Sequence, residues 1–138
     1  MTPADMYSVV LLALCIWREA RGKLYDAKTG VAWTIKNRVA KPGWWGHSWV
    51  SVILQPWQFS SFNHNDPNSG KFPTEADPSW QDSLDVAYKV FNDAIPDPTG
   101  GATSYFDKSM DSDPPKWATD GSNVKTVDLG ALHFYKIA

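Results

Sequence analysis

The stretch that decides the fold is the N-terminal segment MTPADMYSVVLLALCIWREARG, residues 1–22. Pro3 suits the first turn of a helix behind a Thr2 or Asp5 cap, and the closing glycine suits the end of that helix. Between these signals, apolar residues recur at helical spacing on one face and also cover most of the opposite face. The segment therefore predicts a helix from about Pro3 to Arg21 that is buried around most of its circumference.

A carboxylate in the last turn of this apolar helix is the first candidate for a catalytic residue. Glu19 lies at the margin of the main apolar face, so its carboxyl group is directed toward the interior or a cleft wall. Burial and the negative end of the helix raise its pKa, whereas Arg18 or Arg21, if they reach it, lower that pKa. Two interpretations remain open: a buried ion pair with an arginine, or a general acid with a raised pKa.

Farther along, the pattern changes from helices to short strands. Length alone favours one domain, because 138 residues are too few for two comfortable cores. Helices followed by short antiparallel strands indicate an α+β domain that is mainly helical and has a small antiparallel sheet. We expect further helices over 26–40 and 77–94, a short apolar segment at 50–54, an irregular loop over 55–73, and strands at 103–106, 124–127 and 132–135.

Composition restricts the class of function. Eight tryptophans exceed what a core of this size needs, and aromatic faces suit sugar rings, nucleobases or apolar partners. A net charge of −2 argues against nucleic-acid binding, which requires a basic footprint. The three histidines are far apart and form no HExxH pair, Cys15 is the single cysteine, and no GxSxG motif exists. We therefore expect neither a metal nor an organic cofactor.

The apolar N-terminal run is neither a membrane span nor a typical signal peptide. Residues 6–17 fall short of the roughly 20 that a spanning helix needs. Asp5 stands where a signal peptide carries basic residues, and no small-residue cleavage site precedes the charged REARG element. We expect a monomer made without an export signal and without stable membrane association.

Several motifs together resemble the SleB-like cell wall hydrolase family, which comprises spore-cortex lytic enzymes and their bacteriophage relatives. The most specific are EARG, residues 19–22, and NRV, residues 37–39. The wider elements occur in the same order and spacing as in the family: CIWREARG (15–22), GVAWTIKNRV (30–39), VILQPWQFSSF (52–62), DPTGGATSYF (97–106), KWA (116–118) and LHFYK (132–136).

This resemblance implies a lysozyme-like scaffold in which residues 1–138 form a single catalytic domain. It implies cleavage of the glycosidic bond between N-acetylmuramic acid and N-acetylglucosamine in peptidoglycan by a lytic transglycosylase. The family's catalytic glutamate maps onto Glu19, the residue that the helix pattern had already singled out. A hydrolytic muramidase, a zinc-dependent wall amidase and a non-catalytic glycan-binding module remain alternatives, and an aspartate could still assist Glu19.

The same resemblance nominates residues for binding the glycan strand. Amide, hydroxyl and aromatic groups suit N-acetyl groups and pyranose rings, although core packing is an equal alternative for each aromatic residue. Arg21 is nominated before Arg38 as the arginine that touches the site, and His133 matches the family's C-terminal histidine. The nominated substrate-binding residues are Gln58, Phe59, Ser60, Tyr105, Trp117 and Arg21.

Two departures from the family bear on the branch to which the chain belongs. Lys23 follows the EARG element where many relatives have an acid, and the segment FNHNDPNSGKFP, residues 62–73, is longer than in spore enzymes. The second feature favours the phage branch. We therefore expect a bacteriophage endolysin, made in the host cytoplasm and released to the wall at lysis, with a fragment of a secreted spore enzyme as the alternative.

Overall fold

The computed structural model describes residues 1–55 and 58–138, and for Ser60 the backbone alone. Its first helix, α1 (Pro3–Ala20), starts at a capping box in which the Thr2 hydroxyl accepts from the Asp5 amide and the Asp5 carboxylate accepts from the Thr2 amide. Thr2 and Asp5, which the sequence offered as alternatives, thus share the cap. The middle of the helix is fully buried at Leu12 and Ile16.

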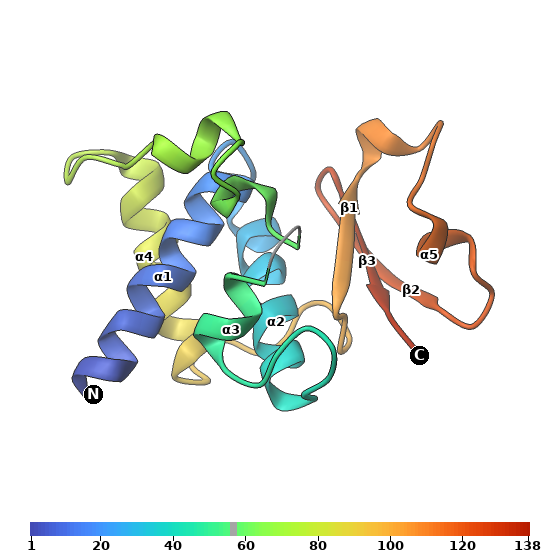
Figure 1. Ribbon diagram of the computed structural model, residues 1–138, viewed down its shortest axis with the longest axis horizontal. Helices are drawn as coiled ribbons and strands as arrows, with labels where there is room; N and C mark the ends of the chain where they lie inside the picture. The colour runs from blue at the N-terminus through green and yellow to red at the C-terminus, as the bar shows by residue number, and fades with distance from the viewer. Residues whose placement is uncertain (56–57) are drawn as a thin grey trace.

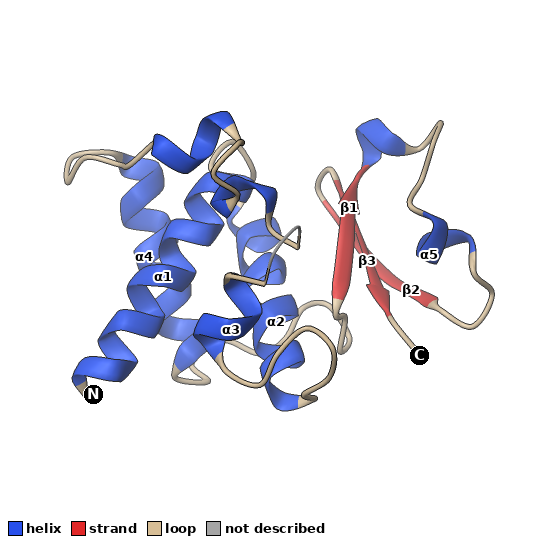
Figure 2. Cartoon of the chain, in the orientation of Figure 1, coloured by secondary structure: helices blue, strands red, loops and turns tan. Residues whose placement is uncertain are grey.

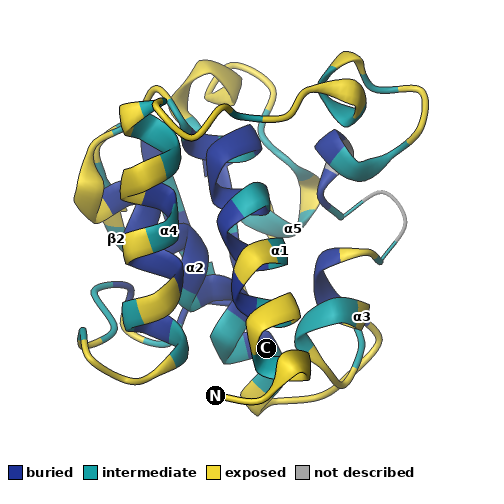
Figure 3. Ribbon diagram, turned by 90° about the vertical axis from the view of Figure 1, so that its left-hand side faces the viewer, coloured by how far each residue is buried: buried dark blue, intermediate teal, exposed yellow. Residues whose placement is uncertain are grey.

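Three further helices pack around α1 in one layer (Figure 1). They are α2 (Tyr25–Ala40), α3 (Trp49–Ile53) and α4 (Pro78–Phe91). Figure 3 shows buried residues concentrated on α1 and α2, with the exposed residues of α4 on its outer side. The apolar segment expected at 50–54 is the helix α3, which Ser48 and Ser51 cap reciprocally.

The helix predicted to continue to residue 94 ends at Phe91. The amide of Asn92 donates back to the Tyr88 carbonyl, and Asp93 adopts the left-handed conformation with φ of 57°. A residue in this conformation cannot continue an α-helix, and Asn and Asp tolerate it better than most side chains do. The end of the helix therefore depends on a local turn that apolar periodicity does not show.

The C-terminal third forms a three-stranded antiparallel sheet in the order β1-β3-β2 (Figure 2). Its strands are β1 (Ser104–Asp107), β2 (Val124–Leu129) and β3 (Leu132–Lys136). Tyr105 pairs with Phe134 in the register between β1 and β3. Each predicted strand is present within two residues of its expected ends, and the α+β fold class is confirmed.

The sheet lies beside the helical layer, and the short helix α5 (Lys116–Thr119) lies on its far side (Figure 1). A small apolar cluster joins the two layers, with Ala20, Val31 and Phe134 buried in it. Short 3-10 turns occupy the connections, at Ser60–Phe62, Pro67–Gly70 and Lys108–Met110. Among the described residues, no helix has the length and apolar character that a membrane span would need.

Candidate active site

A groove of about 750 Å³ opens between the end of α1, helix α2 and strand β1. It brings together residues from five separate parts of the described sequence: 19, 38–44, 58–59, 104–117 and 137. Five of the predicted site residues line it, together with Arg38: Glu19, Gln58, Phe59, Tyr105 and Trp117.

The carboxyl group of Glu19 sits in an environment that favours its neutral form. Burial raises its pKa above the ordinary value, and the negative charge of Asp66 adds to the rise. The nearby Ser61 hydroxyl partly offsets both effects by stabilising the ionised form. That hydroxyl is buried and has no other hydrogen-bond partner among the described residues. Glu19 is therefore suited to hold a proton at pH values where an exposed glutamate has lost it.

The ion-pair interpretation of Glu19 finds no support in the geometry. None of the ion pairs among the described residues involves Glu19. Its neighbour Arg18 instead donates to backbone carbonyls, at 3.0 Å to Ser69 and 3.0 Å to Lys71. Arg18, the nearest arginine in sequence, thus has other partners, and the Glu19 carboxyl group lines the groove with no ion-pair partner among the described residues.

Arg38 is the arginine that the fold places at the groove, whereas the sequence favoured Arg21. The Arg38 guanidinium is buried, donates to the Thr103 carbonyl and to the Ser104 hydroxyl, and lies 3.4 Å from the Gln58 amide oxygen. Arg21 does not line the groove in the described part of the chain. It lies over the Trp17 ring, 4.7 Å from the ring centroid, on another side of α1.

The other predicted binding residues differ in how they line the groove. Phe59 is buried beneath it, with Arg38 over its ring. Trp117 stands edge-on to Phe106, with ring centroids 5.8 Å apart. Tyr105 lies close enough to Glu19 that the carboxylate helps burial to raise the pKa of its phenol. The side chain of Ser60 lies outside the described residues.

Two groove residues escaped the sequence interpretation. Trp44, which is 64% exposed, belongs to the aromatic loop before α3 and contacts the groove at its rim. Asp107 closes β1 and forms an ion pair with Lys23 at 2.8 Å. Strand alternation could have indicated Asp107, because it lies two residues after Tyr105 and so on the same face of the strand.

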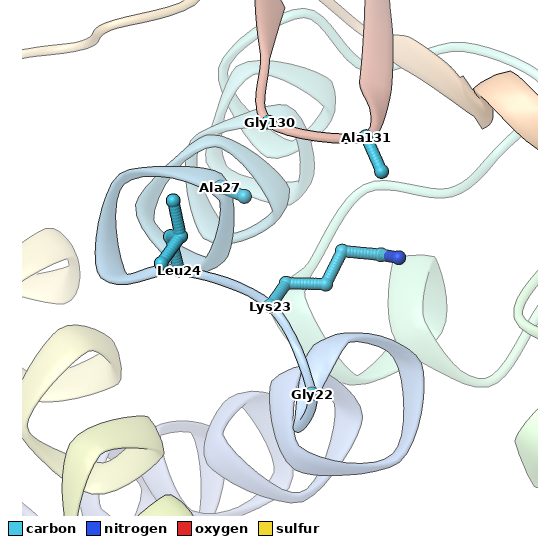
Figure 4. Close-up of a pocket in the computed structure, with 6 residues that line it drawn as sticks. All are labelled: Gly22, Lys23, Leu24, Ala27, Gly130 and Ala131. Carbon is cyan, nitrogen blue, oxygen red and sulfur yellow. The ribbon is translucent and has the colours of Figure 1, made fainter.

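A smaller hollow of about 220 Å³ lies between the α1–α2 turn and the β2–β3 turn. Figure 4 shows its lining, with the Lys23 side chain extending between Gly22 and Ala131. Apart from Lys23, its lining consists of glycine and aliphatic residues. It therefore lacks the acid, amide and aromatic groups found together in the larger groove.

The described residues contain no candidate metal site. Within residues 1–55 and 58–138, no group of three or more His, Cys, Asp or Glu side chains is arranged to hold a metal ion. His133 instead faces two carboxylates, Asp128 at 2.7 Å and Asp111 at 2.8 Å. These contacts connect the loop after β1 to the sheet.

A protonated carboxyl group in an aromatic-lined groove is typical of enzymes that cleave glycosidic bonds. The chain belongs to the cell wall hydrolase family, whose model matches residues 22–135. The matched region begins three residues after Glu19, so the assignment of Glu19 rests on the structure and on the EARG motif.

Two solved structures share the fold over nearly their whole length. The catalytic domain of the Bacillus cereus SleB protein is 25% identical with a TM-score of 0.72, over 95% of this chain and 91% of that chain. The catalytic domain of the germination-specific lytic transglycosylase SleB from Bacillus anthracis is 25% identical with a TM-score of 0.71. That match covers 99% of this chain and 97% of the other. No curated protein sequence matches the chain significantly.

Proposed function

We propose that residues 1–138 form a single catalytic domain that cleaves the glycan strands of peptidoglycan between N-acetylmuramic acid and N-acetylglucosamine as a lytic transglycosylase. The observation that carries this proposal is the position of Glu19, half-buried and without an ion-pair partner among the described residues, in a groove lined by Tyr105 and Trp117. The description of the Bacillus anthracis relative as a lytic transglycosylase supports the same reaction.

In the first step, Glu19 donates its proton to the glycosidic oxygen. The bond between that oxygen and C1 of the muramic acid breaks, the electron pair leaves with the oxygen, and positive charge develops on the sugar. The substrate's own acetamido oxygen can stabilise this charge. In the second step, the C6 hydroxyl oxygen attacks C1, and the Glu19 carboxylate accepts the hydroxyl proton. The products are a 1,6-anhydro-muramic end and a shortened strand, and the enzyme returns to its starting state.

The groove has suitable groups for positioning the sugar rings. Tyr105 and Trp117 present aromatic surface for pyranose rings, and the Gln58 amide can pair with N-acetyl groups. Phe59 would support the floor, and Arg38 holds Gln58 in place through its weak contact. We keep Ser60 and Arg21 as candidates for binding: the Ser60 side chain lies outside the described residues, and Arg21 does not belong to the groove lining among the described residues.

For the biological role, we propose a bacteriophage endolysin that acts as a monomer. The support is the extended segment 62–73, which resembles the phage branch of the family more than the spore enzymes. In this role the protein would be made in the host cytoplasm and reach the wall at lysis. Expression in a bacterial host, with and without a co-expressed membrane-permeabilising protein, tests this role: lysis only in the first case is the expected result.

The decisive test of the reaction is mass spectrometry of fragments released from purified sacculi. We expect the wild type to release muropeptides ending in 1,6-anhydro-muramic acid, and Glu19→Gln to lower that release by about 100-fold or more, because the amide cannot donate the proton. Glu75→Gln is the matched control, since this second glutamate is exposed and lies outside the groove lining.

Other products would indicate a different reaction. If the wild type releases fragments with reducing muramic ends and Glu19→Gln does not, Glu19 remains the acid, but the enzyme is a hydrolytic muramidase. Free stem peptides with intact glycan strands would indicate an amidase. Undiminished release by Glu19→Gln would overturn the assignment of Glu19 altogether.

A further inference from the structure

A second carboxylate, Asp107, lies in the same groove as Glu19. The last turn of α1 and the turn that follows it both approach strand β1. Glu19 is close to Tyr105, and Lys23, four residues later, forms the ion pair with Asp107 at 2.8 Å. Tyr105 and Asp107 share one face of β1, where alternate side chains are about 7 Å apart. Glu19 on α1 and Asp107 on β1 therefore both line the groove, from two elements that border it.

The ion pair between Lys23 and Asp107 has a defined orientation. Asp107 lines the large groove, whereas Lys23 belongs to the lining of the smaller hollow behind it. Among the described residues, the carboxylate of the pair belongs to the groove lining and the lysine does not. Figure 4 shows the Lys23 side chain extending from the turn after α1 beside the smaller hollow. Both side chains are partly exposed, at 24% and 36%, so solvent screens the attraction between them.

Asp107 is also held in place independently of Lys23. Its other carboxylate oxygen accepts from the Ser109 amide at 2.9 Å and caps the short 3-10 turn after β1. Lys23 and this amide together lower the pKa of Asp107 to about 2, whereas burial raises the pKa of Glu19. Lys23 is the charged side chain responsible for the shift, and the other contributions are from Ser109 and burial.

We propose that Asp107 is the second carboxylate of the active site, an anion fixed in the groove wall that stabilises the positive charge developing on the sugar when Glu19 protonates the glycosidic oxygen. This inference rests on the proposed function of Glu19. Asp107 forms no bond to the substrate and transfers no proton in this scheme. Its contribution is electrostatic, and it is largest in the transition state, because the substrate in its ground state is uncharged at C1.

The charge is tested by Asp107→Asn, which keeps an oxygen to cap Ser109 and removes the negative charge. With soluble glycan strands as substrate, we expect kcat to fall by about 10-fold or more, with KM changed by less than about 3-fold, because the lost interaction belongs to the transition state. The melting temperature, followed by circular dichroism, should stay close to that of the wild type. An unchanged kcat would overturn the inference.

Lys23→Met is the matched control, because it breaks the same ion pair but leaves the carboxylate. At neutral pH Asp107 remains ionised in this variant, so kcat should stay within about 3-fold of the wild type. Without Lys23, the pKa of Asp107 returns toward its ordinary value of 3.8. As the pH is lowered, Lys23→Met should therefore lose activity at a higher pH than the wild type does, because its Asp107 carboxylate is protonated earlier.

The control separates a catalytic charge from a structural ion pair. If Lys23→Met lowers kcat at neutral pH as much as Asp107→Asn does, the pair only supports the fold and the inference fails. If the acid limb of the pH profile is the same in Lys23→Met as in the wild type, the inference fails as well. This test does not depend on whether Asp107→Asn folds. If Glu19→Gln is inactive and Asp107→Asn is fully active, the proposed function stands and the role of Asp107 alone is wrong.

Discussion

At the scale of single residues, Glu19 occupies a position that is unfavourable for its ionised form. Its carboxyl group is half-buried beside aromatic side chains, and no arginine among the described residues forms an ion pair with it. Ionisation in such a place is costly because the protein replaces water incompletely. The Ser61 hydroxyl recovers part of that cost, and Asp66 adds to it.

This cost predicts a pH-dependent effect of Glu19→Gln on stability. The pKa of Glu19 is raised above its ordinary value of 4.5, so the folded state binds the proton more tightly than the unfolded state. The associated stability is present below that ordinary value and is lost as the pH rises through the raised pKa. Glu19→Gln should therefore melt close to the wild type at about pH 4 and higher by about 3 °C at about pH 7.

Thermal unfolding at the two pH values checks this expectation, with Glu75→Gln as the control for an exposed glutamate. A melting-temperature difference that is the same at both pH values would mean that the effect of the substitution does not come from the ionisation of Glu19.

At the scale of elements, the irregular segment 58–73 is organised around a single side chain. The Arg18 guanidinium donates to carbonyls of Ser61, Ser69 and Lys71, and aromatic rings lie on it at Phe62 and Phe72, each with its centroid 4.9 Å away. A long loop with little regular structure is thereby fixed to the end of α1. Because Ser61 and Asp66 belong to this loop, its attachment also sets the surroundings of Glu19.

A second contact between elements depends on a glycine. Helix α2 packs closely against the sheet at Gly30, where an added Cβ would lie 2.6 Å from Cζ of Phe134. Phe134 is fully buried, so its ring would have to shift within the core to make room. Gly30→Ala should therefore cost about 1–3 kcal/mol through overpacking, of which the better helix propensity of alanine returns up to about 1 kcal/mol.

Urea denaturation measures this difference, and Gly22→Ala is the matched control, because an added Cβ there would meet nothing within 4 Å. A Gly30→Ala protein as stable as the wild type would show that the contact between α2 and β3 can relax.

At the scale of the whole molecule, the groove exists because the helical layer and the sheet meet along one boundary (Figure 1). Buried Arg38 spans this boundary, since it projects from α2 and donates to the Thr103 carbonyl and the Ser104 hydroxyl at the start of β1. The Lys23–Asp107 pair spans it again at the other end of β1. Arg38 and Asp107, which take part in these bridges, thus also line the groove.

Arg38→Met should consequently destabilise the fold by about 2–3 kcal/mol, because it removes charged hydrogen bonds and leaves buried acceptors unpaired. It should also weaken binding of glycan fragments, since the sheet is no longer held at the same place relative to Gln58. Arg21→Met is the control, and its smaller effect follows from a long contact of 3.4 Å to Asn68 and a stacking contact on Trp17.

Urea denaturation and calorimetric binding of a muropeptide test both variants. The opposite ranking, with Arg21→Met losing more affinity than Arg38→Met, would restore the assignment of Arg21 to the binding site.

The sequence by itself determined the elements and the candidate acid. Caps, apolar periodicity and strand alternation are local signals, so α1, the strands and the α+β class could be predicted within a few residues. Glu19 could be singled out because an isolated carboxylate in an apolar helix is costly and rarely accidental. The tertiary structure alone decided which partners surround that acid. Arg38 instead of Arg21 and the carboxylate of Asp107 line the groove, and the Ser61 hydroxyl lies near Glu19, because segments far apart in the sequence pack together. No local pattern encodes such contacts.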